Sequence, residues 1–211
     1  MKLLKFLLAD DHSIVRRGLK DILQEEFSEA FFEEASDGQE VIRKMKNGTF
    51  DIVISDLSMP IKNGLEVLKI LKPLYPKVPF LMLSMHPEEL YAIRALKAGA
   101  SGYLIKESAP GELVKAVRHV LLGRKYISAA LTEKIAISIG DENPAQPHEV
   151  LSDREMDVLK MISSGKTVSE IASHLNLSVN TISTYRARIM EKMKMKTNAE
   201  LTYYAISNKL V

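Results

Sequence analysis

Short apolar runs alternate with segments of helical spacing along the chain from residue 3 to about residue 123. The runs fall at residues 6–9, 30–35, 51–55, 79–83 and 102–105. After each run, apolar residues recur three and four positions apart, as Val15, Leu19 and Ile22 do after the first. A short apolar run indicates a buried strand, and the three-four spacing indicates an amphipathic helix. The pattern therefore predicts an α/β domain built on a five-stranded, doubly wound parallel sheet with helices on both faces.

A polar joint separates this region from the rest of the chain. Residues 141–148 are polar and include Pro144 and Pro147, so we expect a flexible connection there. The apolar positions within residues 126–140 fit a linker helix that precedes it.

The C-terminal part has the pattern of a small helical domain. Ser152 and Glu155 form a capping-box pattern at the start of one helix, and Gly165 is expected to end it. Three further short helices are predicted at residues 168–174, 179–194 and 198–207. We therefore predict an α/β domain over residues 1–123, a partly helical linker over 124–149 and an all-helical domain over 150–211.

The composition is that of a soluble globular protein, because 46% of the 211 residues are apolar. No apolar run reaches the roughly 18 residues that a membrane-spanning helix needs, so we expect no membrane partner. The apolar start of the chain is interrupted by Lys5 and stops at Asp10, which favours a first strand over a signal segment. Cysteine is absent, which is compatible with a reducing cytoplasm, the localisation that we predict.

The formal net charge of +2 hides one basic stretch. Within residues 178–196, Glu191 is the single acidic residue among five basic ones: Arg186, Arg188, Lys192, Lys194 and Lys196. A local basic stripe is typical of nucleic-acid binding, although it also occurs on ordinary solvated helices.

Chemically active residues stand where the predicted strands end. Asp10 and Asp11 follow the first strand, Asp56 ends the third, Ser84 the fourth, and Lys106 follows the fifth. The carboxyl ends of parallel strands meet at one edge of a sheet, so these side chains should converge. Clustered carboxylates need a hard cation such as Mg²⁺, and a carboxylate can act as a nucleophile on phosphorus. The sequence therefore predicts an ion and phosphate site.

These residues, with Asp56-Leu57-Ser58-Met59-Pro60 and Gly64, resemble the flavodoxin-like receiver domain of two-component response regulators over residues 1–123. The resemblance implies that Asp56 accepts a phosphoryl group from a sensor histidine kinase or a small phosphodonor. It implies that Mg²⁺ lies between Asp10, Asp11, Asp56 and the backbone carbonyl of Ser58. It also implies that Ser84 and Lys106 bind the phosphoryl oxygens, and that Tyr103 is a switch residue that moves inward. Without the resemblance, Tyr103 is interpreted as a half-buried strand aromatic.

An aspartate-nucleophile phosphatase is the competing enzyme class, because it uses the same kinds of residue. It would need a second acid two residues after the nucleophile, where this chain has Ser58. We expect no enzymatic activity beyond phosphoryl transfer to Asp56 and its slow hydrolysis. Of the nearby histidines, His12 is interpreted as a helix-start residue and His86 as a loop residue, rather than as ligands or phosphoryl carriers.

Residues 179–194 have the amphipathic pattern of a recognition helix, with a predicted inner stripe of Ile182, Tyr185, Ile189 and Met193. Three segments resemble the LuxR-type helix-turn-helix of NarL/FixJ response regulators: Leu151-Ser152-Asp153-Arg154-Glu155, Ser169-Glu170-Ile171-Ala172 and Leu177-Ser178-Val179-Asn180-Thr181-Ile182. Double-stranded DNA is the partner that this implies. By position, we assign base contacts to Ser183, Thr184 and Ala187. Phosphate contacts are assigned to Ser178, Thr181, Arg186, Arg188 and Lys192.

The last predicted helix offers a surface for a second copy of the chain through Leu201, Tyr204 and Ala205. We expect a homodimer when the protein is phosphorylated or on DNA, with half-sites about 10 base pairs apart. The same residues also fit the core of their own domain. A protein that titrates another regulator without touching DNA is the third function considered, because Ser183 and Ala187 are short.

Overall fold

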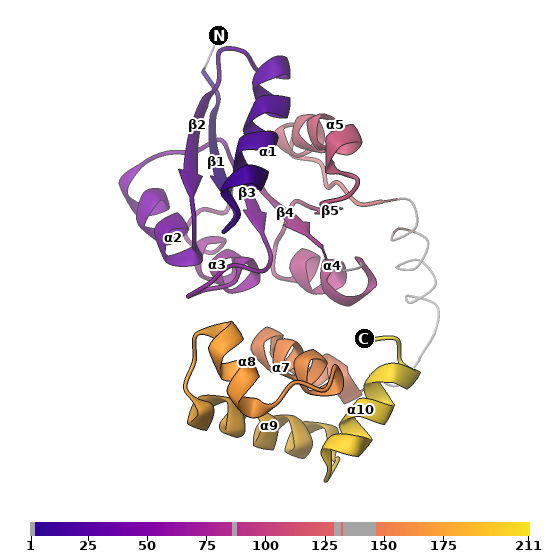
Figure 1. The fold of residues 1–211 in the computed structure, drawn as a ribbon. Coiled ribbons are helices and arrows are strands. Elements are labelled where there is room, and N and C mark those ends of the chain that lie inside the picture. The colour runs from indigo at the N-terminus through magenta and orange to yellow at the C-terminus, as the bar shows by residue number, and fades with distance from the viewer. Residues whose placement is uncertain (1–2, 86–87, 129–131, 133–146) are drawn as a thin grey trace. The chain divides into compact units, whose positions relative to one another are not determined.

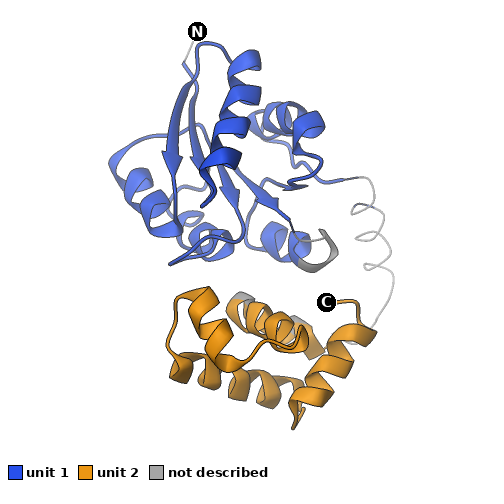
Figure 2. Ribbon diagram, viewed as in Figure 1, with its two compact units in different colours: residues 1–140 blue, residues 141–211 orange. Residues whose placement is uncertain are grey.

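The computed structural model describes residues 3–85, 88–128, 132 and 147–211. They belong to two compact units, Met1–Gly140 and Asp141–Val211 (Figure 2). Among the described residues, no helix is long and apolar enough to cross a membrane.

The first unit is a five-stranded parallel sheet in the order β2-β1-β3-β4-β5 (Figure 1). Its strands are β1 (Lys5–Ala9), β2 (Phe31–Ala35), β3 (Ile52–Asp56), β4 (Phe80–Ser84) and β5 (Gly102–Ile105). Its helices are α1 (Ser13–Glu26), α2 (Gly38–Asn47), α3 (Gly64–Leu71), α4 (Glu88–Lys97) and α5 (Ala109–Leu121). Each helix follows one strand, so the predicted α/β architecture is confirmed.

Both faces of the sheet are largely buried at β1, β3, β4 and β5, whereas the edge strand β2 is mostly half-buried or exposed. Alternate strand residues such as Phe6, Ile54 and Leu81 join Leu23 of α1 and Val117 of α5 in one apolar cluster. The intervening strand residues point to the opposite face and are also inaccessible to solvent: Leu7, Val53, Met82 and Tyr103. Burial on both faces explains why the strands have continuous apolar runs rather than an alternating pattern.

The segment after α5 differs from the predicted linker. Tyr126 forms a parallel bridge with Gly102 of β5 and is only 7% exposed. Residues 126–128 are not helical, and of these Tyr126 pairs with the edge of the sheet. Thr132 is helical, as predicted, and the rest of the predicted linker helix lies outside the described residues. The exact domain boundaries stay a prediction.

The second unit is helical, as predicted. It contains the 3-10 helix η1 (Pro147–Val150) and the helices α7 (Asp153–Ser163), α8 (Val168–Leu175), α9 (Val179–Met193) and α10 (Asn198–Ser207). The predicted capping box is present, because the Ser152 hydroxyl accepts a hydrogen bond from Glu155 N and Glu155 Oε2 accepts one from Ser152 N. Asn176 ends α8 in the left-handed conformation, with φ of 53°.

The turn after β3 brings the start of α3 against the end of the strand. A Cβ added to Gly64 would lie 2.1 Å from the backbone oxygen of Asp56. The N–H of Gly64 donates to Leu57 O at 2.9 Å, so the glycine cannot easily withdraw. Glycine at this position allows the close approach that fixes the backbone of Asp56.

We expect Gly64→Ala to destabilise the first unit by about 2 kcal/mol, because the new Cβ must displace the backbone of Asp56. Gly111→Ala in α5 is the matched control, since nothing lies within 4 Å of its added Cβ. That change should be neutral or stabilise by up to about 1 kcal/mol. Urea unfolding followed by circular dichroism measures both, and equal midpoints for the two variants would contradict the close approach.

Candidate functional site

Asp10 and Asp56 lie side by side at the carboxyl edge of the sheet. The parallel register pairs Ala9 with Ser55, so the next residue of each strand is one of these aspartates. Both are buried, with exposures of 0% and 3%. Lys106 Nζ lies 2.6 Å from Asp10 Oδ2 and 3.1 Å from Asp56 Oδ1. The structure therefore brings these three predicted site residues together.

The charges of this trio are strongly coupled. Burial raises the pKa of the Asp56 carboxyl, against the effect of Lys106, and the negative charge of Asp10 adds to the rise. Burial alone would lower the pKa of Lys106, but the hydrogen bonds and charges of the two aspartates outweigh it and raise that pKa. The lysine is thus held as a cation between two carboxylates.

Asp11 and His12 extend the site toward solvent. His12 Nδ1 lies 2.8 Å from Asp11 Oδ1 and 3.3 Å from Asp10 Oδ1. His12 is the N-cap residue of α1, as its interpretation as a helix-start residue predicts. One carboxylate oxygen or ring nitrogen from each of Asp10, Asp11 and His12 lies within 4.8 Å of the others.

The donor set fits a hard divalent cation. Among the described residues, the buried Asp10 Oδ2 has the Lys106 ion pair but no hydrogen bond of good geometry. A Mg²⁺ ion prefers carboxylate and carbonyl oxygens to imidazole nitrogen, so Asp10, Asp11 and Asp56 suit it better than His12 does.

The remaining predicted residues of this site lie on neighbouring elements. Ser58 is exposed two residues after Asp56, and its backbone N–H donates a hydrogen bond to the Asp56 carboxylate. Ser84 ends β4 and is fully buried, and Lys106 N donates to its carbonyl at 2.8 Å. Tyr103 is also fully buried, so the interpretation as a half-buried aromatic is wrong. His86 lies outside the described residues.

The predicted recognition helix is α9. Ile182, Ile189 and Met193 are buried, whereas Tyr185 is half-buried. Ser178 is the N-cap residue, and its hydroxyl accepts a hydrogen bond from Thr181 N. All the residues assigned to base contacts are exposed: Ser183, Thr184 and Ala187. Of those assigned to phosphates, Ser178, Arg188 and Lys192 are exposed, and Thr181 and Arg186 are half-buried.

Two families match separate parts of the chain. Residues 6–118 match the family described as response regulator receiver domain, and residues 149–205 match the luxR family of bacterial regulatory proteins. The chain belongs to the NarL/FixJ response regulators. Its α/β unit is the receiver domain, and its helical unit is the LuxR-type DNA-binding domain.

Known regulators are similar over nearly the full length. The response regulator UvrY of Escherichia coli is 36% identical over 209 residues, which cover 99% of this chain and 96% of UvrY. The oxygen regulatory protein NreC of Staphylococcus carnosus is 34% identical over 215 residues, with 99% of each chain covered. A structure of RcsB from Salmonella typhimurium has a TM-score of 0.68 at 29% identity, with 98% of each chain covered.

One ion pair of this response regulator was not predicted. Lys192 Nζ lies 2.6 Å from Oε2 of Glu155, whose side chain is only 3% exposed. The same carboxylate oxygen caps α7, so the pair joins the end of α9 to the start of α7. Burial opposes the shift, but Lys192 and Ser152 together lower the pKa of Glu155. The prediction assigned Lys192 to DNA phosphate by its position on the helix.

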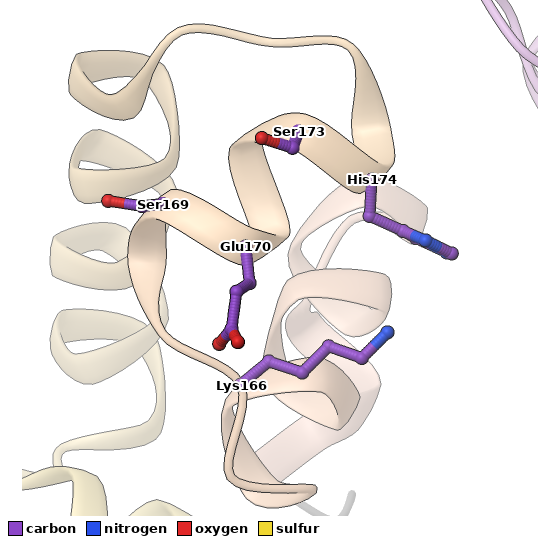
Figure 3. Close-up of a pocket in the computed structure, with 5 residues that line it drawn as sticks. All are labelled: Lys166, Ser169, Glu170, Ser173 and His174. Atoms are coloured by element: carbon purple, nitrogen blue, oxygen red, sulfur yellow. The ribbon is translucent and has the colours of Figure 1, made fainter.

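The sequence analysis also did not predict a surface hollow beside α8. It has a volume of about 610 Å³ and is lined by Lys166, Ser169, Glu170, Ser173 and His174 (Figure 3). The Glu170 carboxylate accepts hydrogen bonds from the backbone N–H and the hydroxyl of Thr167, at 2.7 Å and 2.8 Å. Polar residues three and four apart are ordinary on an exposed helix, so the sequence carried no signal for it.

The outer face of α10 differs from the one predicted. Leu201 and Ala205 are fully buried in their own domain, which confirms the alternative interpretation for them. Tyr204 is half-buried, and its hydroxyl lies 2.9 Å from His148 Nδ1. Tyr203 and Ile206 are the exposed apolar residues of this helix, at 77% and 60%.

We expect Asp56→Asn to raise the unfolding free energy of the receiver at pH 7. The raised pKa means that the folded state holds this proton more tightly than the unfolded chain does. The contribution of the wild-type carboxyl to the unfolding free energy therefore falls as the pH rises from the pKa of an unfolded aspartate through the higher pKa of Asp56 in the folded state. Asparagine has the same shape without the buried charge.

Urea unfolding at a series of pH values measures this gain. It should vanish below about pH 4, where the wild-type carboxyl is protonated in both states. Asp11→Asn is the matched control, because the Asp11 side chain is 33% exposed and its charge remains solvated. A gain that is the same at every pH would contradict the assignment to the Asp56 charge.

Proposed function

We propose that this response regulator takes a phosphoryl group on Asp56 and that the modification controls its binding to double-stranded DNA. The observation that carries the proposal is the Lys106 ammonium held between the buried carboxylates of Asp10 and Asp56. The donors proposed are a phosphohistidine of a sensor histidine kinase and a small acyl phosphate. The proposed place of action is the bacterial cytoplasm, where both the donors and the DNA are present.

In the proposed step, an Asp56 carboxylate oxygen attacks the phosphorus of the donor. A phosphorus–oxygen bond to Asp56 forms while the bond to the donor's histidine nitrogen or acyl oxygen breaks, and the leaving group keeps the electron pair. Mg²⁺, held by Asp10, Asp11, Asp56 and the Ser58 carbonyl, would supply positive charge to the phosphoryl oxygens. Lys106 is near enough to neutralise the same oxygens.

Ser84 and Tyr103 are the proposed switch residues. Ser84 ends β4 beside the site, and Lys106 is hydrogen-bonded to its backbone. A new dianionic group on Asp56 would draw the Ser84 hydroxyl and the Lys106 ammonium toward it, and the buried Tyr103 ring would follow the altered packing. Full switching between 1:99 and 99:1 requires about 5.5 kcal/mol, so a graded response is expected.

The protein is a regulator rather than a typical enzyme. Its only proposed chemistry is phosphoryl transfer to its own Asp56 and slow hydrolysis of the product. An aspartate-nucleophile phosphatase is disfavoured, because it needs an acidic residue two positions after the nucleophile and this chain has Ser58 there.

The DNA-binding proposal rests on α9. Ser183, Thr184 and Ala187 are proposed to face the bases, and Ser178, Thr181, Arg186 and Arg188 to face phosphates. An RcsB–DNA complex of known structure has a TM-score of 0.57 to this chain at 27% identity, with 98% of this chain and 99% of RcsB covered. The buried Glu155 competes with DNA phosphate for the Lys192 ammonium. We therefore propose that Lys192 positions α9 rather than contacts DNA.

A homodimer is proposed for the phosphorylated or DNA-bound protein, with half-sites about 10 base pairs apart. A known structure contains two RcsB dimers bound to two parallel DNAs. The exposed Tyr203 and Ile206 on α10 offer an apolar contact for a second copy.

Incubation with Mg²⁺ and acetyl phosphate should add the mass of one phosphoryl group to the intact protein. Asp56→Asn should take up none, because the nucleophile is gone, and Lys106→Met should take up much less. Intact-mass spectrometry measures the addition, with EDTA as the metal-free control. Equal uptake by wild type and Asp56→Asn would overturn the site assignment.

The salt dependence of DNA binding distinguishes a basic residue that contacts DNA phosphate from one that pairs with a carboxylate of the protein. Arg188→Ala should reduce the slope of log affinity against log salt concentration by about 1, because one phosphate contact is lost. Lys192→Met should leave the slope unchanged but destabilise the helical unit by about 2 kcal/mol, because Glu155 stays buried without its partner. Fluorescence anisotropy with a duplex and thermal unfolding measure these effects. A reduced slope for Lys192→Met would place Lys192 at a phosphate.

A further inference from the structure

Arg16 joins the end of β1 to β2 from the first turn of α1. Its Nη1 donates a hydrogen bond to the backbone oxygen of Asp10 at 2.6 Å, and its Nε donates one to Glu34 Oε2 at 3.0 Å. The Arg16 side chain is 14% exposed, which is low for a charged residue. A planar guanidinium that donates to two fixed partners is itself held in one orientation. Arg16 therefore connects three elements at the edge of the sheet that carries the proposed phosphorylation site.

The backbone of Asp10 is fixed on both sides by hydrogen bonds. Its N–H donates to Ala35 O of β2 at 3.1 Å, and its carbonyl accepts the bond from Arg16. Its carboxylate has partners of its own, because Oδ1 accepts from His12 N at 2.9 Å and Oδ2 lies 2.6 Å from Lys106 Nζ. Among these contacts, the one from Arg16 acts on the peptide that leads to the next residue.

The carbonyl of Asp10 belongs to the peptide that joins it to Asp11. A peptide unit is planar, so holding its oxygen restricts the rotation of the whole unit and the direction in which Asp11 leaves it. Both residues are proposed ligands of Mg²⁺, which requires near-ideal octahedral geometry at about 2.1 Å. Because the Asp11 side chain is 33% exposed, packing restrains it less than it restrains the fully buried Asp10. The orientation of this peptide therefore matters for bringing both carboxylates to one ion.

The charge of Arg16 acts in the opposite direction. A cation beside a cation site repels Mg²⁺, so this charge by itself weakens binding. Glu34 offsets part of the repulsion, because its carboxylate pairs with the guanidinium. Glu34 is held on β2, where it pairs with Leu8 of β1 in the parallel register. Since the two effects have opposite signs, a measurement of Mg²⁺ affinity separates them.

We propose that Arg16 is a positioning residue of the Mg²⁺ site. It holds the peptide between Asp10 and Asp11 in the orientation that directs both carboxylates to the ion, and Glu34 holds its guanidinium. This role rests on the proposed function, because it assumes the Mg²⁺ site beside Asp56. Arg16 is bonded to the carbonyl of Asp10 rather than to a carboxylate, so it acts through the two ligands. Its loss should change the Mg²⁺ concentration that phosphorylation needs rather than the rate once the ion is bound.

Arg16→Met is the first variant, because it removes the donors and keeps most of the buried stem. Its dissociation constant for Mg²⁺ should rise about tenfold, as expected when a residue that orients a metal ligand is lost. If Arg16 acted through its charge, the constant would fall instead. Titration of the full-length protein with MgCl₂, followed by two-dimensional NMR of the backbone amides, measures the constant and shows whether the variant is folded.

Phosphorylation by acetyl phosphate gives a second readout. In Arg16→Met the Mg²⁺ concentration at half-maximal rate should rise by the same factor of about ten, whereas the rate at saturating Mg²⁺ should remain close to that of wild type. A general loss of structure would lower the saturated rate as well.

Arg17→Ala is the matched control, because the neighbouring Arg17 is exposed and its loss removes the same charge. Its Mg²⁺ affinity should be unchanged or slightly higher. Arg16→Lys keeps the charge but replaces the fork by a single ammonium, so its affinity should lie between those of wild type and Arg16→Met. It also decides the question if Arg16→Met does not fold.

An Mg²⁺ affinity at or above that of wild type in Arg16→Met or Arg16→Lys would overturn the positioning role and leave the Mg²⁺ site in place. A wild-type protein whose amide signals do not shift with Mg²⁺ would overturn the site itself, and the positioning role with it.

Discussion

Two carboxylates and one ammonium at the edge of the sheet hold the receiver's site together. Asp10 and Asp56 are neighbours because β1 and β3 pair in parallel register, and two buried like charges this close repel each other strongly. Lys106, which follows β5, stabilises both charges at 2.6 Å and 3.1 Å. The hydrogen bond from Lys106 N to Ser84 O fixes the lysine's backbone to β4. These ion pairs therefore connect the end of β5 to the ends of β1 and β3, with which β5 does not pair.

The strand ends could be predicted from sequence because burial on both faces leaves continuous apolar runs, and the polar residue after each run marks the edge. The partners of Lys106 could not be read in the same way, since they depend on the register of strands that lie far apart in the chain. Tyr103 illustrates a second limit. Its place on β5 was clear, but full burial depends on what covers that face of the sheet, which no local pattern states.

The helical domain shows the same division between local and distant signals. Ser152 and Glu155 are three residues apart, so their capping box was predictable, whereas Glu155 and Lys192 are 37 residues apart and their ion pair was not. In α10, apolar residues occupy both faces of the helix. Leu201 and Ala205 turned out to be buried while Tyr203 and Ile206 are exposed, because only packing against α7 decides which face is inside.

The bridge at Tyr126 determines where the chain leaves the receiver. Tyr103 N donates to Tyr126 O at 3.2 Å, and Tyr126 N donates to Ser101 O at 2.8 Å, so this residue is fastened to β5 on both sides of Gly102. The polypeptide therefore departs from the strand that carries Tyr103 and leads to Lys106, rather than from the end of α5. Any displacement of that strand carries the anchor of the following segment with it. The exit of the chain and Lys106 are therefore both attached to β5.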